Sequence, residues 1–186
     1  MKLQTLILAS AASLLMAGTA MATDIKIGVL NDRSGVYADL SGEGSVIAAR
    51  MAVEDFDAAA KGINVEIVSA DHQNKPDVAS TIARQWYDQD GVDMIADVPT
   101  SSAAFAVAEV TRDKNKIFMD SGAGSADLTG AQCSPNTVHW TYDTWALAHG
   151  TGTAMVQEGY KKWFFITADY AFGQALEKDT SAVVEA

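Results

Sequence analysis

The sequence predicts an α/β fold: an open, mostly parallel β-sheet with helices on both faces. Short runs rich in β-branched residues alternate with longer segments that repeat apolar residues at the helical period. Several of the short runs are apolar at successive positions, which is typical of strands buried on both faces of a parallel sheet. Glycine also stands where helices must release the chain towards the next strand, at Gly62, Gly91 and Gly159.

Five segments are predicted as strands. The first two alternate apolar and polar residues, and the other three are more apolar. In chain order they are residues 24–30, 63–69, 92–98, 116–120 and 163–167. A sixth and weaker strand candidate is residues 137–141.

Five helices are predicted between and after these strands. The helix at residues 76–89 begins with Pro76 in a permissible first-turn position and spaces Val78, Ile82 and Trp86 four residues apart. The others are residues 42–60, 102–115, 144–158 and 172–186. Because the last of them has no closing cap, glycine or proline, we expect the sequence to be the amino-terminal part of a longer protein.

Residues 1–22 are typical of a cleaved export signal. Lys2 gives a positive start, residues 3–20 are uncharged and rich in leucine and alanine, and Ala20-Met21-Ala22 is a small-x-small cleavage site. Polar residues dilute the apolar stretch, which argues against a transmembrane anchor. The mature chain, residues 23–186, would form one domain outside the cytoplasm.

The charge balance disfavours nucleic acid and anionic membrane surfaces as partners. The chain carries a net charge of -11 at pH 7, and cleavage of the predicted signal would remove one more positive charge. Its 48% hydrophobic and 20% charged residues are ordinary for a globular domain. The single cysteine, Cys133, would be a buried thiol or would pair with a residue outside this sequence.

Polar or glycine-rich segments follow three predicted strands at the edge where ligands of open parallel sheets bind. The first contains Tyr37. The second brings Ser101 and Ser102 to a helix start, where either could cap the helix while backbone N–H groups and the helix dipole suit a carboxylate. The third leaves main chain accessible to a ligand, at Gly122, Ala123, Gly124 and Ser125. Each segment alone is common in turns, but three at one edge favour a binding site.

Two further positions are candidates. Asp143, followed by Thr144, could receive a ligand ammonium or amide, or could simply be the N-cap of the next helix. An apolar wall could come from aromatic residues that otherwise belong to the core, namely Tyr37, Trp145, Tyr170 and Phe172.

Signatures of catalysis and of cofactors are not found. No dinucleotide or phosphate-binding glycine motif and no Gly-x-Ser-x-Gly elbow occurs, and the three histidines show no zinc spacing. Asp71-His72 ends a strand in front of a turn, where turn and cap duties explain it. We therefore expect no cofactor, no metal and no catalytic residue.

The order of these motifs resembles a known family, the type I periplasmic solute-binding proteins of ABC importers, in its branched-chain amino acid binding (Leu/Ile/Val-binding-like) group. The resemblance covers residues 24–186. It rests on residues 25–30 with Ser34-Gly35 and Tyr37, Asp71-His72-Gln73 with Pro76 and Ala79, residues 101–104, residues 121–123 with Asp127-Leu128-Thr129, and residues 169–173.

The resemblance implies a periplasmic receptor of two lobes that clamps a small solute and delivers it to a membrane permease. It implies no enzyme activity and a monomer at full length, with residues 23–186 forming the amino-terminal lobe and most of the second lobe missing. The solute would be an amino acid, an amide or an aromatic carboxylate. Gly124 stands where amino acid binders often have threonine and Phe172 where tyrosine is common, which argues against an amino acid. The number of aromatic residues near the site favours an aromatic carboxylate. The implied ligand-binding residues are Tyr37, Ser101, Ser102, Gly122, Ala123, Gly124, Ser125, Asp143, Thr144 and Phe172.

Two alternatives stay open from the sequence. One is an exported α/β enzyme that uses Asp71-His72 or Asp143 with a serine. The other is a ligand-sensing domain of the same fold within a signalling protein.

Overall fold

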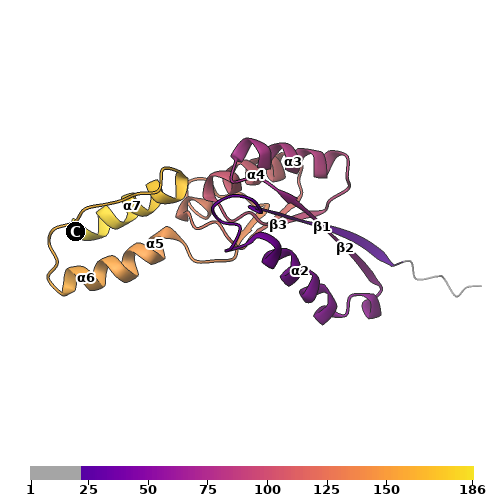
Figure 1. Ribbon diagram of the computed structural model, residues 1–186, viewed down its shortest axis with the longest axis horizontal. Coiled ribbons are helices and arrows are strands. Elements are labelled where there is room, and N and C mark those ends of the chain that lie inside the picture. The colour runs from indigo at the N-terminus through magenta and orange to yellow at the C-terminus, as the bar shows by residue number, and fades with distance from the viewer. Residues whose placement is uncertain (1–21) are drawn as a thin grey trace, which may run out of the picture.

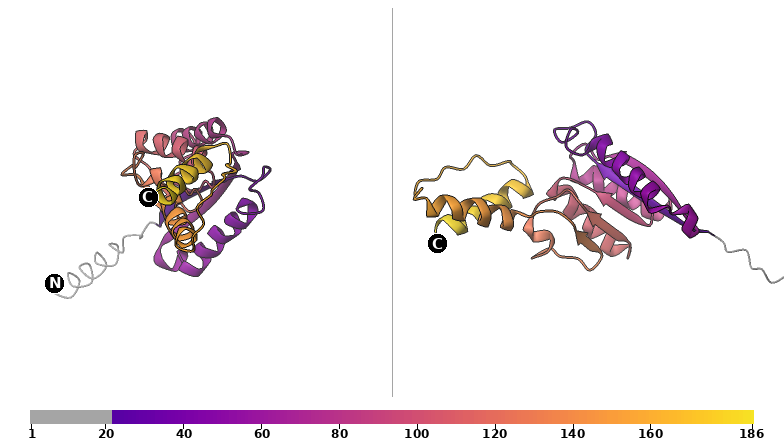
Figure 2. Two further views of the ribbon diagram at one scale, coloured as in Figure 1. Left: turned by 90° about the vertical axis from the view of Figure 1, so that its left-hand side faces the viewer. Right: turned by 90° about the horizontal axis from the view of Figure 1, so that it is seen from below.

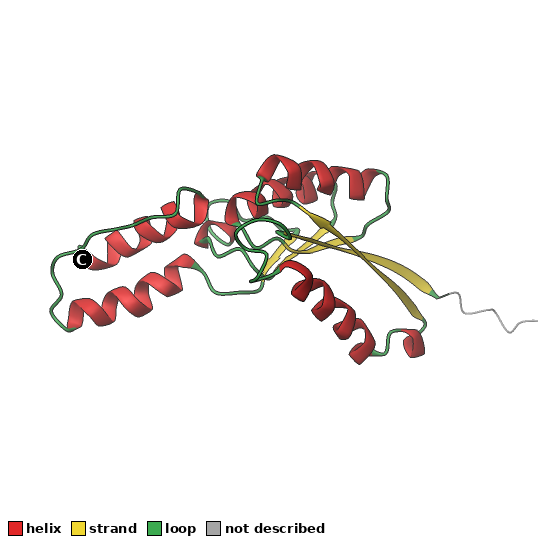
Figure 3. Ribbon diagram, in the orientation of Figure 1, coloured by secondary structure: helices red, strands yellow, loops and turns green. Residues whose placement is uncertain are grey.

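A computed structural model describes residues 22–186 and has a five-stranded, all-parallel sheet (Figure 1). The sheet order is β2-β1-β3-β4-β5, and helices lie on both faces (Figure 3). The predicted α/β fold class is therefore confirmed. The predicted export signal lies outside the described residues, except for Ala22. The strands are β1 Thr23–Asn31, β2 Ile63–Asp71, β3 Met94–Asp97, β4 Ile117–Asp120 and β5 Thr137–His139.

The helices occur where the periodicity predicts them. The predicted helix at residues 144–158 is a continuous helical run that includes one π-helical segment, η4. The bounds are α2 Gly42–Phe56, η2 Ala59–Lys61, α3 Pro76–Asp88, α4 Ser101–Asp113, η3 Ala126–Leu128, α5 Thr144–Leu147, η4 Ala148–Gly152, α6 Thr153–Gln157 and α7 Ala171–Val184. Among the described residues, no helix combines the length and apolarity that crossing a membrane requires.

The core lies between the sheet and helices α3 and α4. Ile95 of β3 and Phe118 of β4 are register partners, and both are fully buried against this layer. Burying a side chain of this size stabilises the fold by about 1.5–3 kcal/mol. Trp86 of α3 packs over β1 at Gly28, where an added Cβ atom would lie 2.4 Å from the tryptophan ring. Glycine at this position therefore makes room for the tryptophan.

The prediction of a strand at residues 163–167 is wrong. This segment is extended, but no described strand pairs with it, and a strand needs the hydrogen bonds of a neighbour. It keeps the alternation of a half-covered strand, because Trp163 and Phe165 are half-buried whereas Phe164 and Ile166 are 88% and 95% exposed. The weaker candidate at residues 137–141 supplies the fifth strand instead, as β5 pairs with β4.

Residues 144–184 form a helical arm that extends away from the sheet (Figure 2). The chain runs outward through α5, η4 and α6, returns in the extended segment, and runs outward again in α7 (Figure 1). Cys133 lies before the arm and is exposed, so the expectation of a buried thiol is wrong. The arm meets the sheet at the carboxyl ends of the strands, which places its first residues beside the predicted site.

Candidate binding cleft

A cleft of about 410 Å³ lies where the carboxyl ends of the strands meet the base of the arm. Residues that follow β1, β3 and β4 line one side of it, and Tyr170 and Phe172 of the arm line the other. Because β2 and β3 lie on opposite sides of β1, the strand order reverses here, as expected for a ligand site in an open α/β sheet. The three polar segments predicted from the sequence therefore meet at one edge.

Four of the ten predicted site residues line the cleft directly, namely Tyr37, Gly122, Gly124 and Phe172. Four others are buried behind its wall, namely Ser101, Ala123, Ser125 and Thr144. Ser102 and Asp143 are only partly buried but do not line the cleft either.

Strand-end aspartates position the loops that carry the lining residues. The buried Asp32 accepts hydrogen bonds from the backbone N–H groups of Gly35, at 2.7 Å, and Tyr37, at 3.0 Å. Asp120 likewise accepts from Gly122, at 3.0 Å, and Ala123, at 2.9 Å. These carboxylates hold the first and third loops in shape from behind.

Burial gives Asp120 an unusual titration. Its Oδ2 atom is buried and has no hydrogen-bond partner among the described residues. Burial, with a smaller contribution from the nearby Asp97, raises the pKa of Asp120 to about 7, although hydrogen bonds from the two loop N–H groups oppose the rise. This carboxyl is therefore partly protonated near neutral pH.

The two serines of the second loop act as ties between segments. Ser101 Oγ accepts the N–H of Ser125 at 3.1 Å, and Ser102 Oγ accepts the N–H of Ala171 at 3.2 Å. The expected capping by a serine is wrong, because the N-cap of α4 is Thr100, which makes no side-chain cap bond. Ser101 thus fixes the glycine-rich loop, and Ser102 fixes the first residue of α7.

Asp143 and Thr144 support the cleft from the start of the arm. Asp143 Oδ1 accepts the N–H of Ala146 at 2.7 Å, so the N-cap alternative describes its contact in this structure. Thr144 donates its N–H to the carbonyl of Gly124 at 2.7 Å, and its hydroxyl accepts the N–H of Ala126 at 3.1 Å. Thr144 thus holds the third loop against the arm, and Asp143 caps the helix that carries Thr144.

Asp97, at the end of β3, lines the cleft with only 6% of its surface exposed. Its carboxylate accepts Asn31 Nδ2 at 3.1 Å and, weakly, the Ser121 hydroxyl at 3.5 Å. Both Asp97 and Val98 have positive φ, 78° and 60°, a strain of roughly 1–3 kcal/mol each that clusters at functional sites. Sequence reasoning missed Asp97, although its position at the end of a central strand is a usable signal.

Aromatic rings close the cleft on the arm side. The Tyr37 and Tyr170 hydroxyls are 2.7 Å apart, and the Tyr170 and Phe172 ring centroids are 6.1 Å apart. Burial raises the pKa of Tyr170, and the hydrogen bond with Tyr37 raises it further, so the phenol stays protonated. A Cβ atom on Gly124 would lie 3.0 Å from the Phe172 ring and 3.1 Å from that of Tyr142. Gly124 therefore leaves the space between two rings open.

His72 does not face the cleft. Its ring is fully buried, and Nδ1 accepts the N–H of Asn74 at 2.9 Å. Burial lowers the pKa of His72, although Asp32, Asp71 and Asp97 oppose the shift. The carboxylate of Asp71 accepts hydrogen bonds from the backbone N–H groups of Arg33 and Gln73. In the part of the chain that the structure describes, no group of three or more histidine, cysteine, aspartate or glutamate residues could hold a metal ion.

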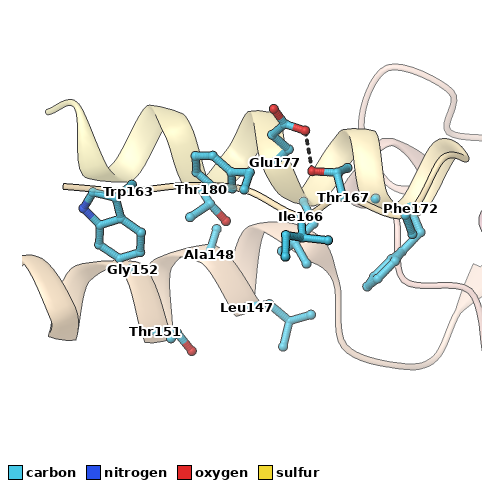
Figure 4. Close-up of a pocket in the computed structure, with 14 residues that line it drawn as sticks. Leu147, Ala148, Thr151, Gly152, Trp163, Ile166, Thr167, Phe172, Glu177 and Thr180 are labelled. Atoms are coloured by element: carbon cyan, nitrogen blue, oxygen red, sulfur yellow. Dashed lines mark hydrogen bonds between the residues drawn. The ribbon is translucent and has the colours of Figure 1, made fainter.

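A second cavity, of about 480 Å³, runs between the helices of the arm (Figure 4). Apolar side chains dominate its lining, among them Leu147, Trp163 and Ile166, and the drawn hydrogen bond joins the Thr167 hydroxyl to Glu177. Ligand sites combine an apolar wall with convergent polar groups. The first cleft meets that description better, and Phe172 lines both spaces.

Comparison of the sequence with protein families matches residues 24–186 to the family described as "Periplasmic binding protein". No curated protein sequence matches the chain.

Several solved structures match the fold. A periplasmic binding protein from Burkholderia mallei is 50% identical, with a TM-score of 0.84 over 88% of this chain and 44% of the other. A branched chain amino acid ABC transporter periplasmic ligand-binding protein from Burkholderia xenovorans is 37% identical, with a TM-score of 0.75 over 87% and 43% of the two chains. An R. palustris solute binding protein in complex with benzoate is 25% identical, with a TM-score of 0.76 over 87% and 46%. The chain thus spans under half the length of each of these proteins.

Proposed function

The chain belongs to the periplasmic binding protein family, and we propose on that premise that it is the solute-binding component of an ABC importer. It captures a small solute in the cleft at the sheet edge and delivers that solute to a membrane permease. The observation that carries the proposal is the cleft itself, in which loops after three strands face aromatic rings of the arm. Hinged closure of two parts around a ligand then provides the signal for delivery.

The proposal includes the organisation of the protein. Residues 1–22 are a cleaved signal that directs the chain to the periplasm, and residues 23–186 are the amino-terminal lobe of a two-lobed receptor that works as a monomer. The helical arm leads from this lobe towards the second lobe. This assignment is supported by the share of the solved structures that the chain covers, 43–46% in the three compared above.

The solute classes that we propose are amino acids, amides and aromatic carboxylates. Support comes from the proteins compared above, one described as a branched chain amino acid transporter component and another solved with benzoate. We propose Tyr37, Gly122, Gly124 and Phe172 as direct contacts because they line the cleft. The other predicted site residues shape it, namely Ser101, Ser102, Ala123, Ser125, Asp143 and Thr144.

Binding without turnover separates this proposal from an exported enzyme. The test uses the mature natural protein at the full length that its gene encodes. Leucine, phenylalanine, benzamide, benzoate and benzylamine are each added, and the unfolding temperature is measured. A ligand at a hundred times its Kd should stabilise the native state by about 2.7 kcal/mol, which raises the unfolding temperature by several degrees.

Recovery of the ligand completes the test. We expect mass spectrometry to return the bound solute unchanged after prolonged incubation. Conversion of the solute would favour the enzyme alternative, and the absence of any shift across these solutes would refute the proposed function.

A further inference from the structure

The cleft has a single charged group on its surface. Asp97 is the only charged side chain among the described residues that line it, and the rest of the lining is hydroxyl, aromatic or apolar. No lysine or arginine therefore faces a ligand from the part of the chain that the structure describes. The described side of the cleft therefore offers a ligand one carboxylate and no cationic side chain.

Asp97 differs from the other strand-end aspartates in how its acceptor positions are used. Asp32, Asp71 and Asp120 each accept two backbone N–H groups of the loop that follows or adjoins them. Asp97 accepts none, and its contacts are one good and one weak bond from side chains. A carboxylate offers about four acceptor sites, so about half of the capacity of Asp97 is unused.

No cation in the described part of the chain compensates this carboxylate. None of the ion pairs of the structure includes Asp97. His72 interacts electrostatically with Asp97, but its ring is buried, and burial lowers its pKa and so favours the neutral form. A charge that is mostly buried is costly unless a partner pairs with it. The partner must therefore come from outside these residues.

The aromatic rings around the cleft also favour a cation as the partner of Asp97. Tyr37, Tyr142, Tyr170 and Phe172 all line the space into which Asp97 faces. Aromatic faces attract cations within about 6 Å of the ring centroid, and rings grouped in this way are a recurrent site for ammonium groups. Among these, Tyr37 and Tyr170 have centroids 6.3 Å apart.

We propose that Asp97 and the cleft rings bind a protonated nitrogen of the solute, so that the solute is a cation or a zwitterion and not a simple anion. This inference rests on the proposed function and narrows its solute class. A plain anion would meet the Asp97 carboxylate as a like charge. The serines of the second loop, which could otherwise favour an anion, do not line the cleft.

The test compares affinities by calorimetry in the full-length mature protein at pH 7. The probes are benzylamine, phenylalanine, benzamide and benzoate, which share a ring and differ in charge. We expect benzylamine or phenylalanine to bind most tightly. Asp97→Asn should weaken that binding by roughly ten- to a hundredfold, because a hydrogen bond to a charged group becomes a neutral one.

Asparagine is a suitable replacement because it tolerates the positive φ at this position and keeps an acceptor for Asn31. The matched control is Asp113→Asn, which removes the same charge at the exposed far end of α4 and should leave affinity unchanged. A second pair tests the rings: Tyr142→Phe should retain most of the affinity, whereas Tyr142→Leu should lose severalfold.

The experiment distinguishes failure of this inference from failure of the proposed function. If no solute of either panel binds, the receptor assignment fails together with this inference. If benzoate binds most tightly, or if Asp97→Asn leaves or improves the affinity of the tightest probe, the receptor assignment stands and the cationic solute is refuted.

Discussion

The hydroxyl groups of Tyr37 and Tyr170 lie 2.7 Å apart, although the two residues are separated by 133 positions in the sequence. Tyr37 follows β1, and Tyr170 is the N-cap residue of α7. A second tie lies nearby, from the N–H of Ala171 to Ser102 Oγ at 3.2 Å. These hydrogen bonds join the arm to the sheet at the cleft, and they are weak enough to be made and broken in the hinged closure that we propose.

Removing the Tyr170 hydroxyl should therefore weaken closure without removing the ring. Tyr170→Phe loses a hydrogen bond that contributes about 1 kcal/mol, and we expect ligand affinity to fall roughly fivefold if closure and binding are coupled. Calorimetry with the tightest probe measures the change. Tyr160→Phe, at an exposed position of the arm, is the control and should bind normally. Equal affinity of Tyr170→Phe and the unaltered protein would show that the tyrosine pair does not contribute to closure.

Gly28 tests the packing of α3 on the sheet. Gly28→Ala places a Cβ atom 2.4 Å from the Trp86 ring, so the helix must shift and we expect a loss of about 1–3 kcal/mol in the free energy of unfolding. Urea denaturation measures it. Gly44→Ala in α2 meets open space and should leave stability unchanged or slightly raised. A Gly28→Ala protein as stable as the parent would contradict the packing described.

Asp120 predicts a specific dependence of stability on pH. Its folded pKa of about 7 lies above the unfolded value of 3.8, so the folded state binds the proton more tightly. The stabilisation is complete below pH 3.8 and is lost as pH rises towards 7, by about 1.4 kcal/mol per unit. From pH 5 to pH 8, ionisation of Asp120 should therefore lower the free energy of unfolding by roughly 2–3 kcal/mol.

Asp120→Asn isolates this contribution. Asparagine can still accept the N–H groups of Gly122 and Ala123 through its oxygen but does not titrate. Urea titrations give the free energy of unfolding of each protein. We expect the value for the variant minus that for the parent to rise by roughly 2–3 kcal/mol from pH 5 to pH 8. Taking the difference cancels the opposite trend of His72, whose lowered pKa makes stability fall as pH drops through 6.5. Parallel pH curves for the two proteins would count against a raised pKa at Asp120.

Local signals in the sequence predicted most of the fold because they reflect local physics. Apolar periodicity and the glycines after helices located each long helix and four strands within a few residues. The segment at residues 163–167 shows where this reasoning stops, because it is more apolar than residues 137–139 and yet forms no strand. Pairing depends on a neighbouring strand, and only the second segment has one among the described residues.

The sequence predicted where the site lies better than it predicted which side chains make its contacts. Parallel strands end at one edge, so Tyr37, Gly122 and Gly124 could be placed there from their position after strands. Asp97 could have been placed there by its position at the end of β3, but the turn of two residues with positive φ that brings it to the cleft has no signal in the sequence. The pairing of Tyr170 with Tyr37 likewise depends on the path of the arm.

The most direct test of the central claim asks whether the solute occupies this cleft. Gly124→Val fills the space beside Phe172 and Tyr142, where even a Cβ atom lies 3.0 and 3.1 Å from the rings. The measurement is a calorimetric titration of the full-length protein with its tightest probe, with Gly44→Ala as the control. We predict one-to-one binding by the parent and the control, and at least tenfold weaker binding by Gly124→Val, whose cooperative unfolding transition shows that the fold is retained. Unchanged affinity in Gly124→Val would place the solute elsewhere and contradict the account.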